Sequence, residues 1–348
     1  MRYLHVEVIM MKFRNLLILG TAISMLVLPS CHKKDKEEKS DPYLDGKLTF
    51  SIPDFVLTGE TFTLVPTGAS NPTTGNVGYS WTSSWISTRD TTKKETASGD
   101  GSWTVTMPLK VGTYSITSNA FATGYTPLSA YQEFCVVDPT VNVTITKAGY
   151  QIDSTAFKDP RDGKTYYLAT TGGNVWMQNN LGYQDSGVSY GYCSAVDPIF
   201  GKLYTWNEAI KACPDGWHLP SDADFVALTG TEAARGETIY GAAGSLMADA
   251  YFLGNKMWTY WPDVKITNKS KFSALPIGYA IDKEDSQHYV GINDYAVFWT
   301  SDEDGESAFY RYIYEDKDNL YSSKGSKDYF RASVRCVKDQ DYLKSVMT

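Results

Sequence analysis

The stretch over 201–225, GKLYTWNEAIKACPDGWHLPSDADF, constrains the fold of this chain most, because it predicts two helix starts close together. Thr205 is followed three residues later by Glu208, which is the pattern of a capping box: each side chain can bond the backbone N–H of the other residue. Apolar residues recur behind this cap at helical spacing, Pro214 ends the helix, and Ser221 begins a second one. We interpret the stretch as a scaffold, since nothing in it resembles a reaction centre.

The composition excludes one class of protein and favours another. The chain has 348 residues, which is long enough for two domains, and a formal net charge of −8. An acidic chain without basic clusters lacks the electrostatic footprint of a nucleic-acid-binding protein, so we expect no nucleic-acid partner. The aromatic share is high at 14%, and such a composition suits β-rich extracellular domains.

The N-terminal residues have the pattern of an export signal. Lys12 and Arg14 precede an apolar run over 16–28, which has the length of a signal-peptide core and is short for a membrane span. The run leads into LPSC, which resembles a bacterial lipobox with Cys31 as the lipidated residue. We therefore expect 1–30 to be a lipoprotein signal peptide, and acyl chains on the cysteine to attach the protein to the membrane.

The residues after this signal predict a tether. Residues 31–46 are charged and lack apolar periodicity, so we expect them to be disordered. Their mixture of acidic and basic residues resembles the surface-export tethers of Bacteroidetes lipoproteins, which implies the outer face of the outer membrane. A simple solvated spacer has the same composition. A plain secretory signal that is cleaved elsewhere, or a membrane anchor, is the alternative to the lipoprotein.

Residues 47–138 predict an all-β immunoglobulin-like or PKD-like sandwich. Short alternating runs are separated by Gly, Asn, Asp and Pro at the spacing of such a fold. Trp81 is expected to fill its core from a central strand, and the segment around Tyr114 resembles the corner that leads into a late strand of these modules. No cluster of catalytic residue types occurs here. We expect a spacer, with ligand binding by its loops as the alternative.

The second half of the chain carries motifs in a fixed order. They are DPRDG (159–163), WM (176–177), NL (180–181), YTW (204–206), GWHLPS (216–221), FSALP (272–276) and VRCV (334–337). In this order they closely resemble the Fibrobacter succinogenes major paralogous domain, a family of secreted bacterial modules. We expect this domain over 146–339, with a C-terminal tail over 340–348. The resemblance implies an α+β C-type-lectin-like fold, shared with formylglycine-generating enzymes, and it implies no reaction.

The resemblance also implies a disulfide between Cys213 and Cys336, which would join the first helix to the last strand. An exported protein is in an oxidising compartment, where such a bond persists. Closing so large a loop is worth on the order of 4–5 kcal/mol. Cys135 and Cys193 can pair across the domain junction, but we prefer free thiols, and the sequence does not fix the connectivity.

Metal-dependent functions of related folds need ligands that the sequence supplies poorly. Formylglycine-generating enzymes hold Cu(I) with two nearby cysteines, and Cys336 has no second cysteine close to it in sequence. Calcium-dependent sugar binding needs a cluster of oxygen ligands. Asp294, Asp302 and Glu303 are weak candidates for it, because the Pro-centred triplets of that class are missing. His218 is expected to be a core histidine satisfied by a hydrogen bond, and no zinc-site spacing is present.

Aromatic residues in the long irregular middle of the second domain form the candidate ligand site. In lectin-like folds this region makes the exposed ligand loops, and flat rings suit the apolar faces of sugars and also anchor protein interfaces. The alternative is that they fill a loop-rich core. The candidates are Trp258, Tyr260, Trp261, Tyr279, Tyr289 and Tyr295.

Other aromatic residues are interpreted as structural. The alternation of Tyr310, Tyr312 and Tyr314 is typical of a half-exposed strand. The tryptophans expected in the core are Trp176, Trp206, Trp217 and Trp299.

The sequence thus predicts a bacterial cell-surface lipoprotein that recognises or adheres to an extracellular glycan or protein without catalysis. A structural component of a surface fibre or complex is one alternative, and an enzyme with an unrecognised site on the lectin-like domain is another. Its partners are expected to be the outer membrane, through the lipid on Cys31, and the unknown ligand. No cofactor is expected, although calcium is possible.

Overall fold

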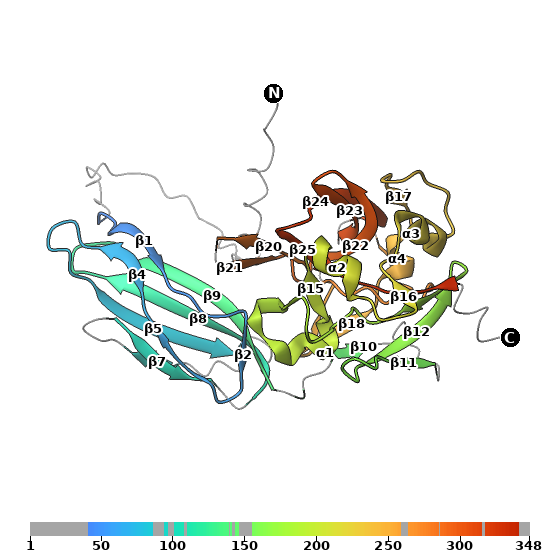
Figure 1. Ribbon diagram of the computed structural model, residues 1–348. Coiled ribbons are helices and arrows are strands. Elements are labelled where there is room, and N and C mark those ends of the chain that lie inside the picture. The colour runs from blue at the N-terminus through green and yellow to red at the C-terminus, as the bar shows by residue number, and fades with distance from the viewer. Residues whose placement is uncertain are drawn as a thin grey trace, which may run out of the picture. The chain divides into compact units, whose positions relative to one another are not determined.

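The computed structural model describes residues 41–85, 94–96, 101–107, 110–138, 140, 143–145, 155–258, 264–284, 286–314 and 317–340. The expected signal peptide, most of the tether and nearly all of the C-terminal tail therefore lie outside the described residues. The end of the expected tether is not disordered, because Leu44 is buried and a strand begins at Asp45. Strands dominate the described part, with a few short helices, which confirms a β-rich fold (Figure 1). No helix in this part is long and apolar enough to cross a membrane. The immunoglobulin-like and C-type-lectin-like topologies stay predictions.

Within the described residues, the expected first domain contains three sheets. Their strands are β1 (Asp45–Thr49), β2 (Phe55–Leu57), β3 (Thr61–Leu64), β4 (Thr67–Ser70), β5 (Gly78–Trp85), β6 (Lys94–Thr96), β7 (Trp103–Thr106), β8 (Gly112–Phe121) and β9 (Leu128–Val137). The largest sheet has the order β2-β9-β8-β5-β6, and the others pair β1 with β4 and β3 with β7.

The core of this domain contains Trp81, as the sequence predicts. Its indole is 0% exposed, and Nε1 donates to the carbonyl oxygen of Gly101 at 2.6 Å. The hydroxyl of Tyr114 donates to the carbonyl oxygen of Lys110 at 2.8 Å. This bond back to the preceding backbone fixes the entry into β8. A similar bond is typical of immunoglobulin-like sandwiches, where it is called a tyrosine corner.

The second domain is organised around one large sheet. Its order is β14-β15-β25-β22-β23-β24-β17, and β20 joins β25 and carries β21 on its other side. The strands are β14 (Val188–Ser189), β15 (Lys202–Tyr204), β17 (Ile239–Tyr240), β20 (Tyr279–Lys283), β21 (Ser286–Val290), β22 (Tyr295–Asp304), β23 (Ser307–Tyr314), β24 (Asn319–Ser326) and β25 (Phe330–Ser333).

Smaller sheets and short helices complete the domain. The remaining strands are β10 (Val143–Ile145), β11 (Ala156–Lys158), β12 (Thr165–Thr171), β13 (Asn174–Met177), β16 (Trp217–His218), β18 (Ala250–Phe252), β19 (Asn255–Lys256) and β26 (Val337–Lys338). The helices are the 3-10 turns η1 (Tyr190–Tyr192) and η2 (Ser194–Val196), with α1 (Asp197–Phe200), α2 (Trp206–Ala212), α3 (Asp222–Thr229) and α4 (Ala243–Leu246).

The predicted capping box at Thr205 and the predicted N-cap at Ser221 are both confirmed, and Ser221 also forms a capping box. At the start of α2, the backbone N–H of Thr205 donates to the Glu208 carboxylate at 2.8 Å, and the Thr205 hydroxyl accepts from the Glu208 N–H at 3.3 Å. At the start of α3, Ser221 and Asp224 make the same reciprocal pair. Because these bonds satisfy N–H groups that a helix start leaves unpaired, they explain why such short helices form here.

The disulfide between Cys213 and Cys336 is confirmed, with 5.8 Å between the Cα atoms. It joins the C-cap of α2 to the residue directly before β26, rather than to a residue within a strand. Cys135 and Cys193 are free thiols, and the second is buried.

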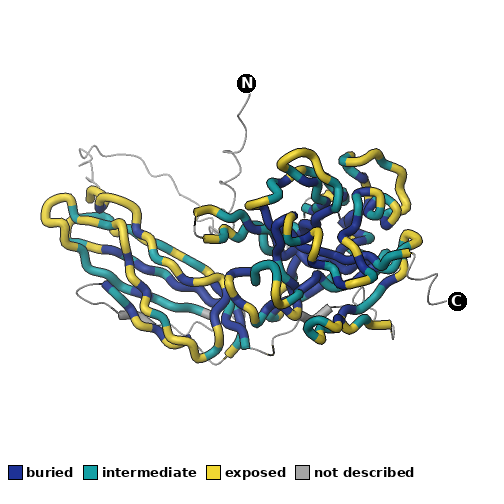
Figure 2. The backbone as a smooth tube through the Cα atoms, in the orientation of Figure 1, coloured by how far each residue is buried: buried dark blue, intermediate teal, exposed yellow. Residues whose placement is uncertain are grey.

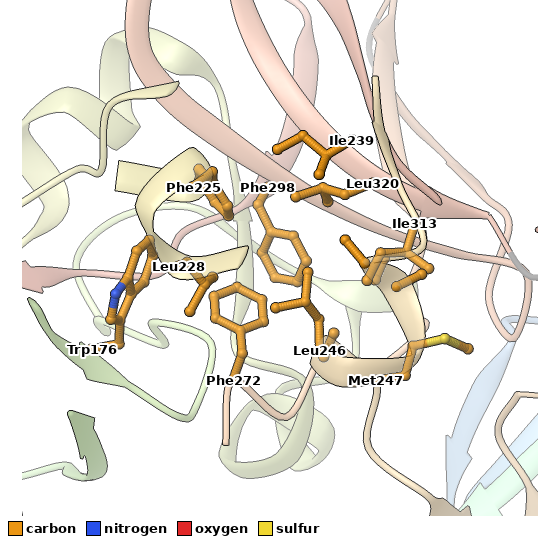
Figure 3. Packing of buried hydrophobic residues seen from close by; sticks show 14 of the residues in the cluster. Trp176, Phe225, Leu228, Ile239, Leu246, Met247, Phe272, Phe298, Ile313 and Leu320 are labelled. Carbon is orange, nitrogen blue, oxygen red and sulfur yellow. The ribbon is translucent and has the colours of Figure 1, made fainter. Parts of the chain in front are cut away.

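The large sheet has a hydrophobic core on each side. One core contains α3 and α4, and Figure 3 shows Phe225, Phe272 and Phe298 gathered at its centre. The other contains α2 and the buried Trp299. Figure 2 shows that buried residues are concentrated in the strands of the domain, while its loops are exposed. Trp176, Trp206 and Trp217 are also buried, as predicted.

Several of the ordered motifs meet at one buried arginine. Arg335 Nε donates to Asn180 Oδ1 at 2.6 Å, its Nη2 donates to the carbonyl oxygen of Ser273 at 3.1 Å, and its Nη1 donates to that of Phe272. The side chain is 0% exposed. The motifs NL, FSALP and VRCV are therefore held together by one guanidinium group. This structural role explains why they occur together, and no catalytic role is needed.

Candidate functional site

Strand β23 divides its side chains between core and surface. Arg311 and Ile313 are buried, whereas Tyr310, Tyr312 and Tyr314 are half-buried. Because successive side chains of a strand point to opposite faces of the sheet, the three tyrosines share one face and the buried pair lies on the other.

Tyrosines on the two neighbouring strands extend this row. Tyr295 of β22 lies opposite Tyr314 in the register, and the two rings stack with centroids 4.6 Å apart and planes at 25°. Tyr321 of β24 lies opposite Tyr312, and these rings stack at 5.0 Å and 20°. Cross-strand aromatic pairs of this kind also stabilise the sheet.

The row continues over β25 to β20. Phe330 stacks on Tyr310 at 4.8 Å and 16°, and Tyr279 stacks on Phe330 at 5.2 Å and 30°. Tyr279 also meets the ring of Tyr295 edge-on at 6.0 Å. The rings form one continuous surface, which we call the tyrosine face: Tyr279, Tyr295, Tyr310, Tyr312, Tyr314 and Tyr321.

Among the described residues, the side chains between the rings of the tyrosine face are uncharged, while Asp294 stands next to Tyr295 in the chain. The residues between its rings include Val297, Ala308 and Ser323, which carry no formal charge. Beyond Ala308 the same side of the strands ends at the ion pair of Glu303 with Lys327, whose atoms lie 2.6 Å apart and neutralise each other.

Burial disfavours the ionised form of three phenols of this face. It raises the pKa of Tyr279, Tyr295 and Tyr310 above the ordinary value for tyrosine, because the phenolate form loses hydration. These three side chains therefore present neutral hydroxyl groups and aromatic carbon.

The predicted ligand residues divide into different environments. Tyr279 and Tyr295 belong to the tyrosine face. Trp258 does not: it is 0% exposed in the core that contains α3, and its Nε1 donates to the carbonyl oxygen of Ala274 at 3.3 Å. Its proposed role as a ligand anchor is therefore wrong, because the core already covers the indole. Tyr260 and Trp261 lie outside the described residues.

Tyr289 lies away from the tyrosine face. Its ring packs against Tyr190 at 4.9 Å and Tyr192 at 5.3 Å, and its hydroxyl donates to the carbonyl oxygen of Ser189 at 2.9 Å. Because its hydroxyl and ring contact other residues of the domain, we interpret Tyr289 as structural. The strand tyrosines that the sequence analysis treats as structural complete the face instead.

Two of the three weak calcium candidates, Asp302 and Glu303, bond to other groups of the protein, and the third, Asp294, lies apart from them. Asp302 accepts from the backbone N–H of Asp222 at 2.7 Å, and Glu303 pairs with Lys327. Asp294 lies in the turn before β22, where burial raises the pKa of its carboxyl group. Within the described residues, no three His, Cys, Asp or Glu side chains are grouped so that they can hold a metal ion.

The prediction for His218 is correct for bonding and wrong for burial. Its Nδ1 lies 2.6 Å from Asp339 Oδ1, but the side chain is 44% exposed. Its Nε2 lies 3.8 Å from Asp224 Oδ2. Strand β16 is an edge of its small sheet, which leaves the imidazole at the surface.

A cavity of about 490 Å³ lies elsewhere, beside β2 and η2. Phe55, Leu57 and Phe62 line it together with Ala195 and Pro198, so its wall is largely apolar. Its lining contains a single carboxylate, from Glu60, which already accepts from the backbone N–H of Leu57 at 2.9 Å. The lining therefore contains no acid–base pair.

The fold and this face define a β-rich type of domain with an aromatic surface. The family model of the Fibrobacter succinogenes major domain matches residues 169–338, just under half of the chain, and this range contains the whole tyrosine face. The match supports the family resemblance seen in the motifs. No curated protein matches the sequence. Among solved structures, the Yersinia pseudotuberculosis adhesin InvE is similar at 11% identity and a TM-score of 0.23, covering 85% of this chain and 70% of that one.

Proposed function

We propose that this chain is a bacterial cell-surface lipoprotein whose second domain recognises an extracellular glycan or protein without transforming it. The continuous tyrosine face carries the proposal. Tyrosine is enriched in recognition surfaces because its ring gives a large rigid contact area at little cost in conformational entropy, while its hydroxyl bonds polar groups. All six tyrosines are only half-buried, so part of each side chain stays at the surface.

The chemistry of the face favours binding over catalysis. A general acid or base works best when its pKa is near the working pH. The tyrosine face contains only phenols, and burial raises the pKa of Tyr279, Tyr295 and Tyr310 away from that range. This supports a role in recognition rather than in a reaction.

The N-terminal sequence supports the proposed location. The LPSC pattern motivates lipidation of Cys31, and the charged residues after it would let the folded domains reach away from the outer membrane. The first domain then serves as a spacer, and the family to which the second domain is similar consists of secreted bacterial modules.

Assembly into a surface fibre is the second candidate function. Among the described residues, the strand β21 pairs with β20 alone, and an unpaired edge can receive a strand from another chain. At Gln287, however, the outer N–H of β21 donates to the hydroxyl of Tyr192 at 2.7 Å. This contact blocks part of the edge, so we prefer ligand recognition.

The test is a binding screen with the full-length chain against immobilised glycans and extracellular proteins. Tyr312→Ala and Tyr314→Ala should each weaken binding about thirtyfold, as expected for the loss of an interface anchor. Tyr131→Ala is the matched control, because this tyrosine is 59% exposed on β9 of the first domain. Equal binding by all three variants, with unchanged thermal unfolding, would refute the proposed site.

A further inference from the structure

We infer that two adjoining cavities beside η1 form a binding site for a small organic cation, an amine with a hydrocarbon body. The site is separate from the tyrosine face, and the inference does not rest on the proposed recognition role. It follows from how the cavities meet, from the backbone between them, and from a carboxylate that has no partner among the described residues.

The two cavities share part of their lining. The first is the largely apolar cavity of about 490 Å³ beside β2 and η2. The second, of about 480 Å³, is lined by residues 51–54, which precede β2, and by residues 286–289 of β21. Pro53, Gly191 and Tyr192 line both, so the two spaces adjoin. Their volumes lie within the range of about 300–1,000 Å³ that is typical of sites for small molecules.

The backbone between the cavities is held in an unusual conformation. Gly191 and Tyr192 have φ angles of 58° and 59°, and this left-handed region is unfavourable for a tyrosine. Position 191 needs a glycine, because a Cβ there would lie 2.9 Å from the ring of Phe55 and 3.4 Å from the Cβ of Asp54. Strained backbone of this kind is often found at ligand sites.

The side chain of Tyr192 is fixed at both ends while its ring stays open. Its hydroxyl accepts from the backbone N–H of Gln287 at 2.7 Å, and its ring meets that of Tyr289 edge-on at 5.3 Å. The residue is nevertheless 62% exposed. The strained backbone and the anchored hydroxyl therefore hold an accessible aromatic ring at the point where the cavities meet.

The walls of the site belong to a packed core. Phe55 of β2 meets the ring of Tyr190 edge-on at 5.8 Å, and both are buried in the cluster that also contains Cys193. A ligand would thus meet walls that are already formed. Binding to a preformed site avoids the entropy cost of ordering its side chains.

Asp54 gives the second cavity its charge. Among the described residues, neither a hydrogen bond nor an ion pair engages its carboxylate. Solvent still reaches the residue, but partial desolvation raises the pKa of the carboxyl group. His288 lines the same cavity without an ion pair to Asp54, and the described linings of both cavities contain no lysine or arginine. A cation from outside would supply the missing counter-charge.

The two cavities together favour an amphipathic cation. An ammonium group is attracted both by a carboxylate and by the face of an aromatic ring, and Asp54 and Tyr192 line the same cavity. The side chains of Leu57 and Phe62 line the other cavity, where they suit a hydrocarbon chain. An anion would be repelled by Asp54, and a sugar would leave the apolar lining without a match.

The experiment is calorimetric titration of the full-length chain with hexylamine, hexanol and hexanoate at pH 7. These probes have the same hydrocarbon chain and differ in charge. We expect hexylamine to bind about tenfold more tightly than hexanol, the effect of one bond between charged groups, and hexanoate to bind more weakly than both. Butylamine should bind about tenfold more weakly than hexylamine, because it buries two methylene groups fewer.

Asp54→Asn keeps the shape of the side chain and removes its charge, so it should reduce the affinity for hexylamine to that for hexanol. Asp45→Asn is the matched control, because Asp45 is exposed on β1 and lies in neither lining. Tyr192→Gly is a second variant that suits the left-handed backbone, and it should weaken hexylamine about threefold through loss of the ring. Thermal unfolding of each variant checks that it folds.

The comparison of probes uses the unchanged chain, so it decides the charge preference even if a variant folds poorly. No binding of hexylamine, or equal binding of hexylamine and hexanoate, overturns the inference. So does a folded Asp54→Asn variant that binds hexylamine as well as Asp45→Asn does. None of these results affects the proposed role of the tyrosine face, whose test uses other ligands and other variants.

Discussion

Removal of the Asp222 carboxylate is expected to destabilise the second domain strongly. Nε and Nη2 of Arg311 each donate to it at 2.7 Å, and both side chains are almost fully buried. In Asp222→Ala the guanidinium stays buried without its counter-ion. Breaking a buried pair from one side costs about 3–5 kcal/mol, against a total of about 5–15 kcal/mol for an ordinary domain.

The assay is urea unfolding followed by tryptophan fluorescence, and the double variant Asp222→Leu with Arg311→Met is the matched control. Because the double variant removes both charges and leaves apolar side chains in their place, it should lose less stability than Asp222→Ala alone. Arg311 lies between Tyr310 and Tyr312 in β23, so the double variant should also keep the tyrosine face in register.

The reasoning fails if Asp222→Ala lowers the free energy of unfolding by less than about 1 kcal/mol, which would mean that water or another group neutralises the guanidinium. It also fails if the double variant is less stable than Asp222→Ala. The ion pair would then stabilise the fold by more than the neutralisation of each charge by the other.

Three other predictions concern the anchor, the disulfide and pH. Cys31→Ala should abolish incorporation of labelled fatty acid, and continued labelling would contradict the lipoprotein assignment. Replacing Cys213 and Cys336 by serine opens a loop of 123 residues and should cost about 5 kcal/mol in urea unfolding, unless strain offsets it; an unchanged midpoint would show that the bond does not stabilise the fold. Hydrogen bonds to Asp224 and then to Asp339 raise the pKa of His218. The charged imidazole therefore stabilises the fold fully below about pH 6.5, and this stabilisation is lost as the pH rises through the raised pKa. The loss of stability caused by His218→Gln should accordingly become smaller with increasing pH.

The parts of the fold that depend on neighbouring residues could be predicted from the sequence. The capping boxes at Thr205 and Ser221 need only side chains three residues apart, so their pattern is visible in the chain itself. The core position of Trp81 follows from strand alternation in the same local way. The disulfide came from the family resemblance, because residues this far apart give no local signal.

The tyrosine face could not be predicted in this way, because it depends on strand register. Tyr295 and Tyr314 are distant in sequence and become partners only when β22 and β23 pair. Trp258 shows the opposite error: an aromatic residue in an irregular segment has no periodicity to reveal that the chain folds over it. The alternation of Tyr310, Tyr312 and Tyr314 indicated that their side chains share one face of a strand. It did not reveal which residues of the neighbouring strands lie beside them.

The disulfide between Cys213 and Cys336 has a mechanical consequence for a tethered adhesion protein. All six tyrosines of the face lie between these cysteines in the sequence. A ligand at Tyr314 would pull on a point inside this loop, against the proposed membrane anchor at the N-terminus. Two routes join Tyr314 to Cys213: about 101 residues directly (314 − 213), or about 22 residues through Cys336 and the bond (336 − 314). Because the shorter route limits the extension, this part of the chain can lengthen to about 75 Å rather than about 340 Å, at about 3.4 Å per residue. The domain could then be sheared under load while the strands of its contact surface stay linked.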